Sequence, residues 1–130
     1  MIKRIILIVS LIISSIIQIG NGYLDLKRQQ PDNLRIRAGK CGPVGPWINP
    51  EVNQMDWTNK NDLHINITVP SICESGGWVG NYVIEDENHL ILEYEAALPS
   101  ASACLCPREL RYKIKDIKKK DYTISLRPME

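Results

Sequence analysis

Leu63-His64-Ile65-Asn66-Ile67-Thr68-Val69 is the stretch of sequence that decides the fold of this chain. Apolar and polar side chains alternate through it without a break, which places every apolar side chain on one face of an extended strand. Most of its residues are β-branched, and such residues favour strands. We therefore predict a strand over 63–69 with one buried face, ended by Pro70, which cannot donate a hydrogen bond to a neighbouring strand.

The same period of two recurs on both sides of this stretch, and no window shows the 3.6-residue period of a helix. It predicts further strands at 34–38, 82–84, 90–96, 110–115 and 122–127. The polar turn at 85–88 joins two of them as a β-hairpin. The glycine- and proline-rich segments 39–62 and 71–80 are predicted to be loops. Six or seven short strands in one domain predict an all-β sandwich or a small barrel.

The N-terminus has the pattern of a secretory signal. Lys3 and Arg4 precede an apolar run over residues 5–19, and Gly20-Asn21-Gly22 supplies small residues for cleavage. A retained membrane anchor is the alternative, but this run is shorter than the roughly 20 residues needed to span a bilayer. We expect a signal peptide over 1–22, cleaved after Gly22.

The remaining residues, 23–130, are expected to form a single β-sandwich domain that is secreted or periplasmic, with no stable membrane insertion. Removal of the signal lowers the formal net charge of the chain from +1 to −1. This near-neutral balance argues against a general nucleic-acid binder, which would be strongly basic.

The chain has four cysteines, and all of them lie in the expected mature part: Cys41, Cys73, Cys104 and Cys106. An even number of cysteines in an exported chain predicts disulfides. A direct bridge between Cys104 and Cys106 would close a very tight ring with strained geometry. We therefore expect each of these two to pair with one of the two upstream cysteines, and the sequence leaves open which pairs with which.

A metal site is the alternative use of these cysteines. Two residues apart on a strand, Cys104 and Cys106 would project to the same face, and with Cys41, Cys73, His64 or His89 they could bind a soft metal ion as thiolates. The spacing gives only one such pair where zinc sites usually have two, and export favours oxidation. We expect disulfides, with no bound metal and no cofactor.

The segment 110–126 contains a recognisable local pattern. Ile117, four residues of turn, and then Tyr122, Ile124 and Leu126 resemble the tyrosine corner of immunoglobulin-like and fibronectin type III sandwiches. The resemblance implies an immunoglobulin-like antiparallel β-sandwich in which the Tyr122 hydroxyl bonds to the backbone just upstream. Those folds add a further strand after this one, whereas this sequence stops at residue 130.

The Cys104-Leu105-Cys106 motif is similar to a layout seen in small exported bacterial proteins with no assigned activity, and it carries no function across.

Charged side chains suggest how two strands pair. Glu93 and Glu95 share the polar face of one predicted strand, and Arg111, Lys113 and Lys115 share that of another. Opposed across an antiparallel ladder, these charges would help to set the register. Alternatively, the acidic and basic segments are separate binding patches.

Three tryptophans are the candidate binding residues. Trp47, Trp57 and Trp78 lie in or beside the predicted loops, where binding residues gather on a rigid scaffold, and tryptophan is enriched among interface anchors. The alternative is that the same rings fill the core or pack the loops, because the chain has no Phe.

No catalytic constellation is recognisable. A cysteine nucleophile would need His64 or His89 as its base, and no Gly-x-Ser-x-Gly motif occurs. We expect a non-catalytic binding module for a protein partner that the sequence does not identify. The alternatives are an inhibitor of an extracytoplasmic enzyme and a metal-binding protein that uses the Cys-x-Cys pair.

Overall fold

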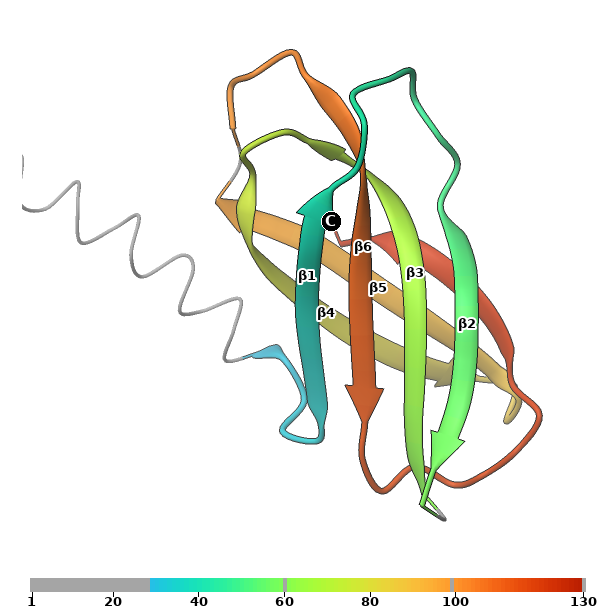
Figure 1. The fold of residues 1–130 in the computed structure, drawn as a ribbon. Coiled ribbons are helices and arrows are strands. Elements are labelled where there is room, and N and C mark those ends of the chain that lie inside the picture. Colours follow the sequence, from blue (N-terminus) through green and yellow to red (C-terminus); the bar gives the residue numbers. More distant parts are fainter. Residues whose placement is uncertain (1–28, 60, 99, 130) are drawn as a thin grey trace, which may run out of the picture.

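The structure is a computed structural model that describes residues 29–59, 61–98 and 100–129 (Figure 1). The predicted signal peptide, residues 1–22, lies outside the described residues. Within the described ranges, no helix is long and apolar enough to cross a membrane.

The described chain folds into two β-sheets packed face to face (Figure 1). In chain order the strands are β1 (Leu34–Cys41), β2 (Glu51–Thr58), β3 (Asp62–Ile72), β4 (Gly76–Glu85), β5 (His89–Leu98), β6 (Leu105–Ile114) and β7 (Thr123–Pro128). One sheet has four strands in the order β1-β6-β3-β2, and the other has three in the order β4-β5-β7. The predicted all-β sandwich is confirmed.

One strand pair departs from the expected antiparallel arrangement. The pairs β1–β6, β2–β3, β3–β6 and β4–β5 are antiparallel, whereas β5 and β7 run parallel. The chain leaves the four-stranded sheet at the end of β6 and crosses to the three-stranded sheet before β7 begins. This crossover brings β7 alongside β5 in the same direction.

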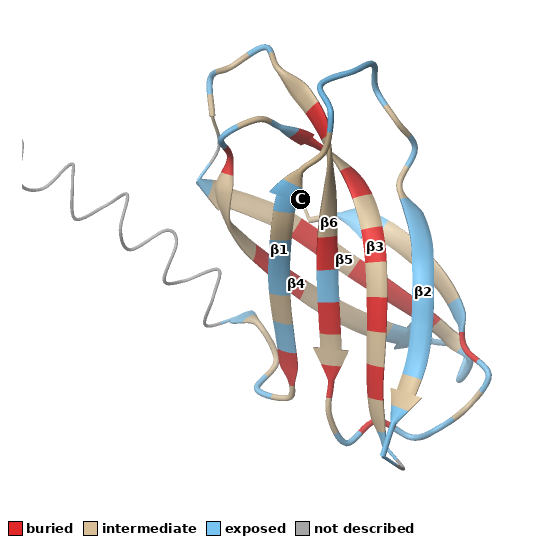
Figure 2. Cartoon of the chain, viewed as in Figure 1, coloured by how far each residue is buried: buried red, intermediate tan, exposed pale blue. Residues whose placement is uncertain are grey.

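The core lies between the sheets and is built from alternate residues of the central strands. β3 and β6 pair over ten positions, from Leu63 opposite Ile114 to Ile72 opposite Leu105. Buried positions recur at every second residue of β3 (Figure 2). The largest fully buried side chains are Tyr112, Leu63, Ile65, Ile67, Leu90, Leu92, Leu110, Ile114, Val69 and Val79. The half-buried strand that the alternation predicts at 63–69 is confirmed.

The prediction of a continuous loop over 39–62 is wrong, because β2 forms within it. β2 is an edge strand, and nearly all of its residues are exposed (Figure 2). A shift in register between Val52 and Gln54 further interrupts its alternation. A strand with almost nothing to bury has no hydrophobic period by which it could be recognised.

Two strand boundaries also differ from prediction. β3 continues through Pro70 to Ile72, because β2 pairs with β3 only as far as Thr68. Beyond that point β3 has β6 on one side alone, and a strand with a free side tolerates proline. The predicted loop 71–80 is short, since β4 already begins at Gly76.

The predicted ladder between Glu93 and Glu95 on one side and Arg111, Lys113 and Lys115 on the other does not form. β5 pairs with β4 and β7, whereas β6 pairs with β1 and β3 in the opposite sheet. The partner of the Glu93 carboxylate is instead the guanidinium of Arg127 on β7, at 3.2 Å. Charge alternation on two strands thus says nothing about which strands are neighbours.

One hydrogen bond joins the two sheets through the core. Tyr112 on β6 is fully buried, and its hydroxyl donates to the backbone carbonyl of Glu93 on β5 at 2.6 Å. Burial raises the pKa of the Tyr112 phenol, so the hydroxyl remains a proton donor. Removal of that donor would leave a buried carbonyl with one partner fewer.

We expect Tyr112→Phe to lower the free energy of unfolding by about 1–2 kcal/mol, the usual cost of losing such a buried hydrogen bond. Urea denaturation followed by tryptophan fluorescence measures this change. Tyr94→Phe is the control, because the Tyr94 side chain is also buried and its hydroxyl makes no hydrogen bond within the described residues. Equal stability losses for the two variants would contradict the assigned role of the Tyr112 hydroxyl.

Candidate functional site

Two disulfides fasten one end of the sandwich. Cys41 at the end of β1 is bridged to Cys106 on β6, and Cys73, just after β3, is bridged to Cys104, just before β6. The Cα–Cα distances are 5.5 and 5.3 Å. The expectation that Cys104 and Cys106 each pair with an upstream cysteine is confirmed. Two disulfides in so small a β domain fit an extracellular or otherwise oxidising compartment.

The two bridges lie next to each other. The sulfur atoms of Cys41, Cys73 and Cys106 are all within 4.8 Å of one another. As disulfides they have no thiolate to offer a metal ion, whereas on reduction the same positions would present several soft ligands together. The metal alternative therefore applies to the reduced protein alone.

The first bridge also holds the base of the loop that joins β1 to β2, residues 42–50, which we call the tip loop. The amide of Gly42 donates to the carbonyl of Pro107 at 2.8 Å, and that of Gly45 donates to the carbonyl of Leu105 at 3.2 Å. A Cβ atom on Gly42 would come within 2.7 Å of the Pro107 ring, so only glycine permits this close approach. The tip loop is fastened along the start of β6.

The tip loop presents two large apolar side chains to solvent. Trp47 is 65% exposed and Val44 is 71% exposed. Pro43 precedes Val44 and Pro46 precedes Trp47, and both prolines fix backbone φ angles within the loop. The exposure of Val44 could not be predicted from the sequence, because a single valine between loop prolines carries no periodic signal.

The other two candidate tryptophans lie elsewhere. Trp57 on β2 stacks on Tyr122 with ring centroids 6.3 Å apart, and both Trp57 and Trp78 are partly buried against the core. The indole nitrogen of Trp78 is buried without a hydrogen-bond partner among the described residues. The structure therefore does not bring the three tryptophans together, and Trp47 alone stands out from the surface.

Tyr122 lies at the crossover between the sheets. Its hydroxyl donates to the backbone carbonyl of Lys118 at 2.6 Å, across the segment between β6 and β7. This is the upstream backbone bond that the tyrosine-corner resemblance implies. Together with the stacked ring of Trp57 it holds the crossover against the core.

The two histidines do not meet a cysteine nucleophile, because all four cysteines are in disulfides. The Nε2 atom of His89 lies 2.5 Å from the hydroxyl of Ser125 on β7. No carboxylate hydrogen-bonds to His89 within the described residues. His64 lies on the outer face of the four-stranded sheet, opposite Lys113.

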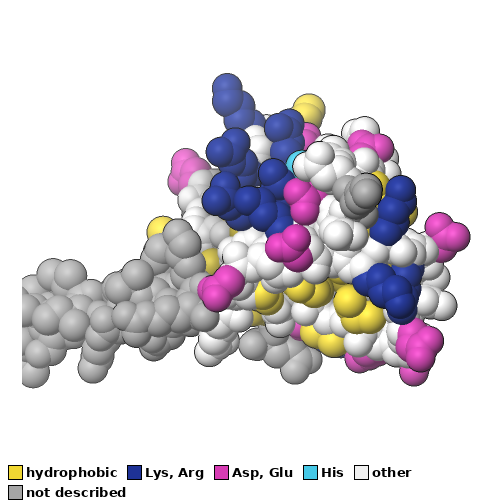
Figure 3. All heavy atoms as spheres, turned by 90° about the horizontal axis from the view of Figure 1, so that it is seen from below, with side chains coloured by type: hydrophobic (Ala, Val, Ile, Leu, Met, Phe, Trp, Pro, Cys, Tyr) yellow, Lys and Arg dark blue, Asp and Glu magenta, His cyan; other side chains and the backbone are white. Residues whose placement is uncertain are grey.

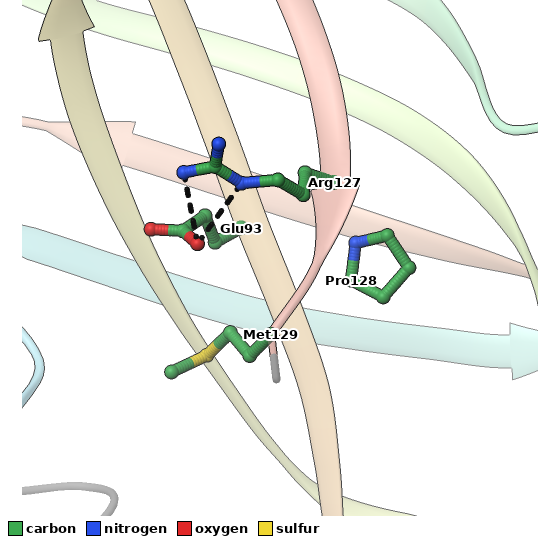
Figure 4. A pocket seen from close by; sticks show the side chains of 4 residues that line it. All are labelled: Glu93, Arg127, Pro128 and Met129. Carbon is green, nitrogen blue, oxygen red and sulfur yellow. Dashed lines mark hydrogen bonds and ion pairs between the residues drawn. The ribbon is translucent and has the colours of Figure 1, made fainter.

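A hollow of about 410 Å³ lies beside the end of β7 and is lined by Glu93, Arg127, Pro128 and Met129 (Figure 4). The two charged groups that line it are paired with each other, and the Glu93 carboxylate also accepts a hydrogen bond from the Asn81 amide at 3.3 Å. Its charges are already compensated within the protein, so the hollow offers little to a charged ligand.

Comparison with protein-family models, with curated proteins and with solved structures finds no match for this chain.

Removal of either bridge should destabilise the fold. The cysteines of Cys41–Cys106 are separated by 65 positions in the sequence and those of Cys73–Cys104 by 31. The chain-entropy relation then predicts a loss of about 4 kcal/mol for each, with the larger loss for the longer loop. Urea denaturation of Cys41→Ala/Cys106→Ala and of Cys73→Ala/Cys104→Ala measures the two losses. A melting curve that reductant leaves unmoved would contradict the structural role of the bridges.

Proposed function

We propose that this protein is an exported, non-catalytic binding module that contacts a protein partner through its tip loop. The observation that carries the proposal is the exposure of Trp47 on a loop whose base is cross-linked to β6 by the Cys41–Cys106 bridge. Large apolar side chains at a protruding point are costly to hydrate, and tryptophan is the residue most enriched among anchors of protein interfaces.

The attachment of the tip loop supports this proposal. A loop that is held by a disulfide and by the Gly42 and Gly45 backbone hydrogen bonds loses little conformational entropy when it binds. The three prolines of the loop restrict it further: Pro43, Pro46 and Pro50. The favourable free energy of burying the Trp47 ring would then not be offset by the cost of ordering the loop.

The chemistry of the tip indicates the kind of partner. The indole ring of Trp47 and the side chain of Val44 fit an apolar pocket that has an acceptor for the indole N–H at its rim. An inhibitor of an extracytoplasmic enzyme is the special case in which that pocket is an active site.

We expect Trp47→Ala to abolish capture of the partner from the exported fraction, because truncation of an interface anchor typically costs about 2 kcal/mol or more. With the purified partner, calorimetry should show an increase in Kd of about thirtyfold or more. The variant should melt at the wild-type temperature, since the Trp47 ring is mostly outside the core.

Met55→Ala is the matched control. Met55 is also a partly exposed apolar residue, but it lies on the edge strand β2 away from the tip loop, so its truncation should leave capture unchanged. If Trp47→Ala still captures every partner that the wild type captures, the tip loop is not the binding site.

A second candidate function, metal binding, is supported by the clustering of the sulfur atoms of Cys41, Cys73 and Cys106. Reduction would convert these three cysteines to thiolates, and Cys104, the partner of Cys73, would supply a fourth. Zinc prefers such tetrahedral sets of thiolate ligands.

We expect the reduced protein to bind about one equivalent of Co²⁺ as a spectroscopic substitute for Zn²⁺, with a thiolate-to-metal absorption band, and the oxidised protein to show none. The Cys73→Ala/Cys104→Ala variant, which removes one bridge, is the control and should lose the band. Absence of the band in the reduced wild type would rule out this candidate.

A further inference from the structure

The outer face of the four-stranded sheet carries a compact group of positive charges. Arg35 on β1 lies opposite Lys113 on β6, and Arg37 lies opposite Arg111. The residues next to them in the sequence face the core, so these four side chains face outward. We call these four residues the cationic grid. Figure 3, which views the sandwich from its lower end, shows a large group of Lys and Arg side chains on one side of the molecule and smaller groups elsewhere.

This arrangement works against the stability of the sheet. Side chains directly opposite each other on paired strands have Cβ atoms about 4.5–5.5 Å apart, and like charges at that distance repel. In the described part of the chain, one ion pair touches the grid, between Arg111 and Glu109 at 2.6 Å. Arg35, Arg37 and Lys113 have no ion pair recorded there. Most of the positive charge is therefore uncompensated within the described residues.

The cationic grid borders a hollow in the sheet surface. The hollow has a volume of about 340 Å³ and is lined by Arg35, Arg37, His64, Asn66, Arg111, Tyr112 and Lys113. A second hollow, of about 300 Å³, adjoins it through His64, Asn66 and Arg111. Its other lining residues are Gln54, Asp56 and Thr58 on β2. The joined surface is thus cationic over β1 and β6, and rich in amide and hydroxyl groups over β3 and β2.

A histidine nitrogen without a hydrogen-bond partner lies between the cationic part of this surface and its polar part. The Nε2 atom of His64 is buried and has no hydrogen-bond partner among the described residues, although its side chain lines both hollows. Such buried polar atoms are rare in folded proteins and usually have a water or a ligand group as partner. Beside the charge, this nitrogen is a second observation at the same place, and a ligand in the hollow would reach it once the imidazole ring turned outward.

We infer that this surface binds a carbohydrate that carries at least two phosphate or sulfate ester groups. The cationic grid would hold the ester groups, because arginine guanidinium groups bind such oxyanions through two parallel hydrogen bonds. The spacing of the grid, about 5 Å across the strands and about 7 Å along them, lets the long side chains of the grid reach two ester groups on one sugar unit. The amide and hydroxyl groups of Gln54, Asn66 and Thr58 would meet the sugar hydroxyls.

The charges at the far end of the surface set a limit on the ligand. Asp56 lies beside the Gln54 amide, which donates to its carboxylate, and this negative charge disfavours an anion over β2. A ligand with anionic groups along its whole length, such as a nucleic acid, would meet repulsion there. The esters are therefore confined to the end of the ligand that lies over β1 and β6.

Calorimetric titration of the oxidised protein with sucrose octasulfate and with fructose 1,6-bisphosphate tests the inference. We expect saturable binding of at least one, and binding of one probe alone identifies sulfate or phosphate as the ester. Arg35→Gln/Arg37→Gln should weaken it about tenfold or more, because a lost hydrogen bond to a charged group corresponds to at least that factor. The signal of the His64 imidazole in NMR spectra should move during the titration.

Lys118→Gln/Lys119→Gln is the matched control, because it removes the same charge from two exposed positions in the β6–β7 segment. It should change the affinity by less than about twofold, since screened charges at a distance contribute little. The Arg35→Gln/Arg37→Gln variant should melt at or above the wild-type temperature, because it relieves like-charge repulsion. If it melts lower, Arg111→Gln replaces it, since the Arg111 side chain is 64% exposed.

Three results would overturn the inference. The first is that neither sugar ester binds. The second is that the grid variant and the lysine control lose affinity equally, which would mean that net charge alone is responsible. The third is that a mixed-sequence oligonucleotide binds more tightly than both sugar esters at the same salt concentration.

Discussion

The antiparallel pairing of β3 with β6 is the interaction on which the rest of the structure depends. It runs for ten positions through the middle of the four-stranded sheet, and its inward side chains form much of the core. β6 also carries Cys106 and Tyr112, which join it to β1 and to the opposite sheet. A slip of one residue in this register would turn the core side chains to solvent and carry these connections away from their partners.

The same alternation that builds the core also distributes the candidate surfaces. Along β6, Tyr112 points inward to Glu93, while Arg111 and Lys113 point outward to the surface hollow. The tip loop, in turn, is fastened to the first residues of this strand. The central strand thus positions both an apolar protrusion at one end of the sandwich and a basic surface on its side, without sharing side chains between them.

The sequence allowed the buried strands to be predicted, because burial on one face leaves a period of two that is visible without any knowledge of the neighbours. The same logic fails for β2, whose residues are exposed and carry no period. It also fails for pairing between strands: Glu93 meets Arg127 on a parallel neighbour, and Arg111 faces Arg37. Charge alternation describes one strand, whereas the order of strands depends on crossovers such as the one at Tyr122.

The candidate sites were predictable to a smaller extent. The export pattern and the even number of cysteines allowed the bridges to be anticipated, but not their pairing, because partners 65 and 31 positions apart leave no local trace. Trp47, Trp57 and Trp78 look alike in the sequence, and only the packing of Trp57 and Trp78 against the core separates them from Trp47. The cationic grid could not be predicted, because it exists only where β1 and β6 are neighbours and no local pattern indicates that pairing.

The Cys41–Cys106 bridge makes the attachment of the tip loop depend on the redox state of two thiols. In a reducing compartment the two thiols would be free, and nothing covalent would hold the tip loop to β6. The tip loop would then have more conformational freedom. A partner that bound Trp47 would have to order the loop, at an entropic cost. If the protein is exported and binds through Trp47 as proposed, oxidation would fasten the tip loop only after the chain has left the reducing compartment.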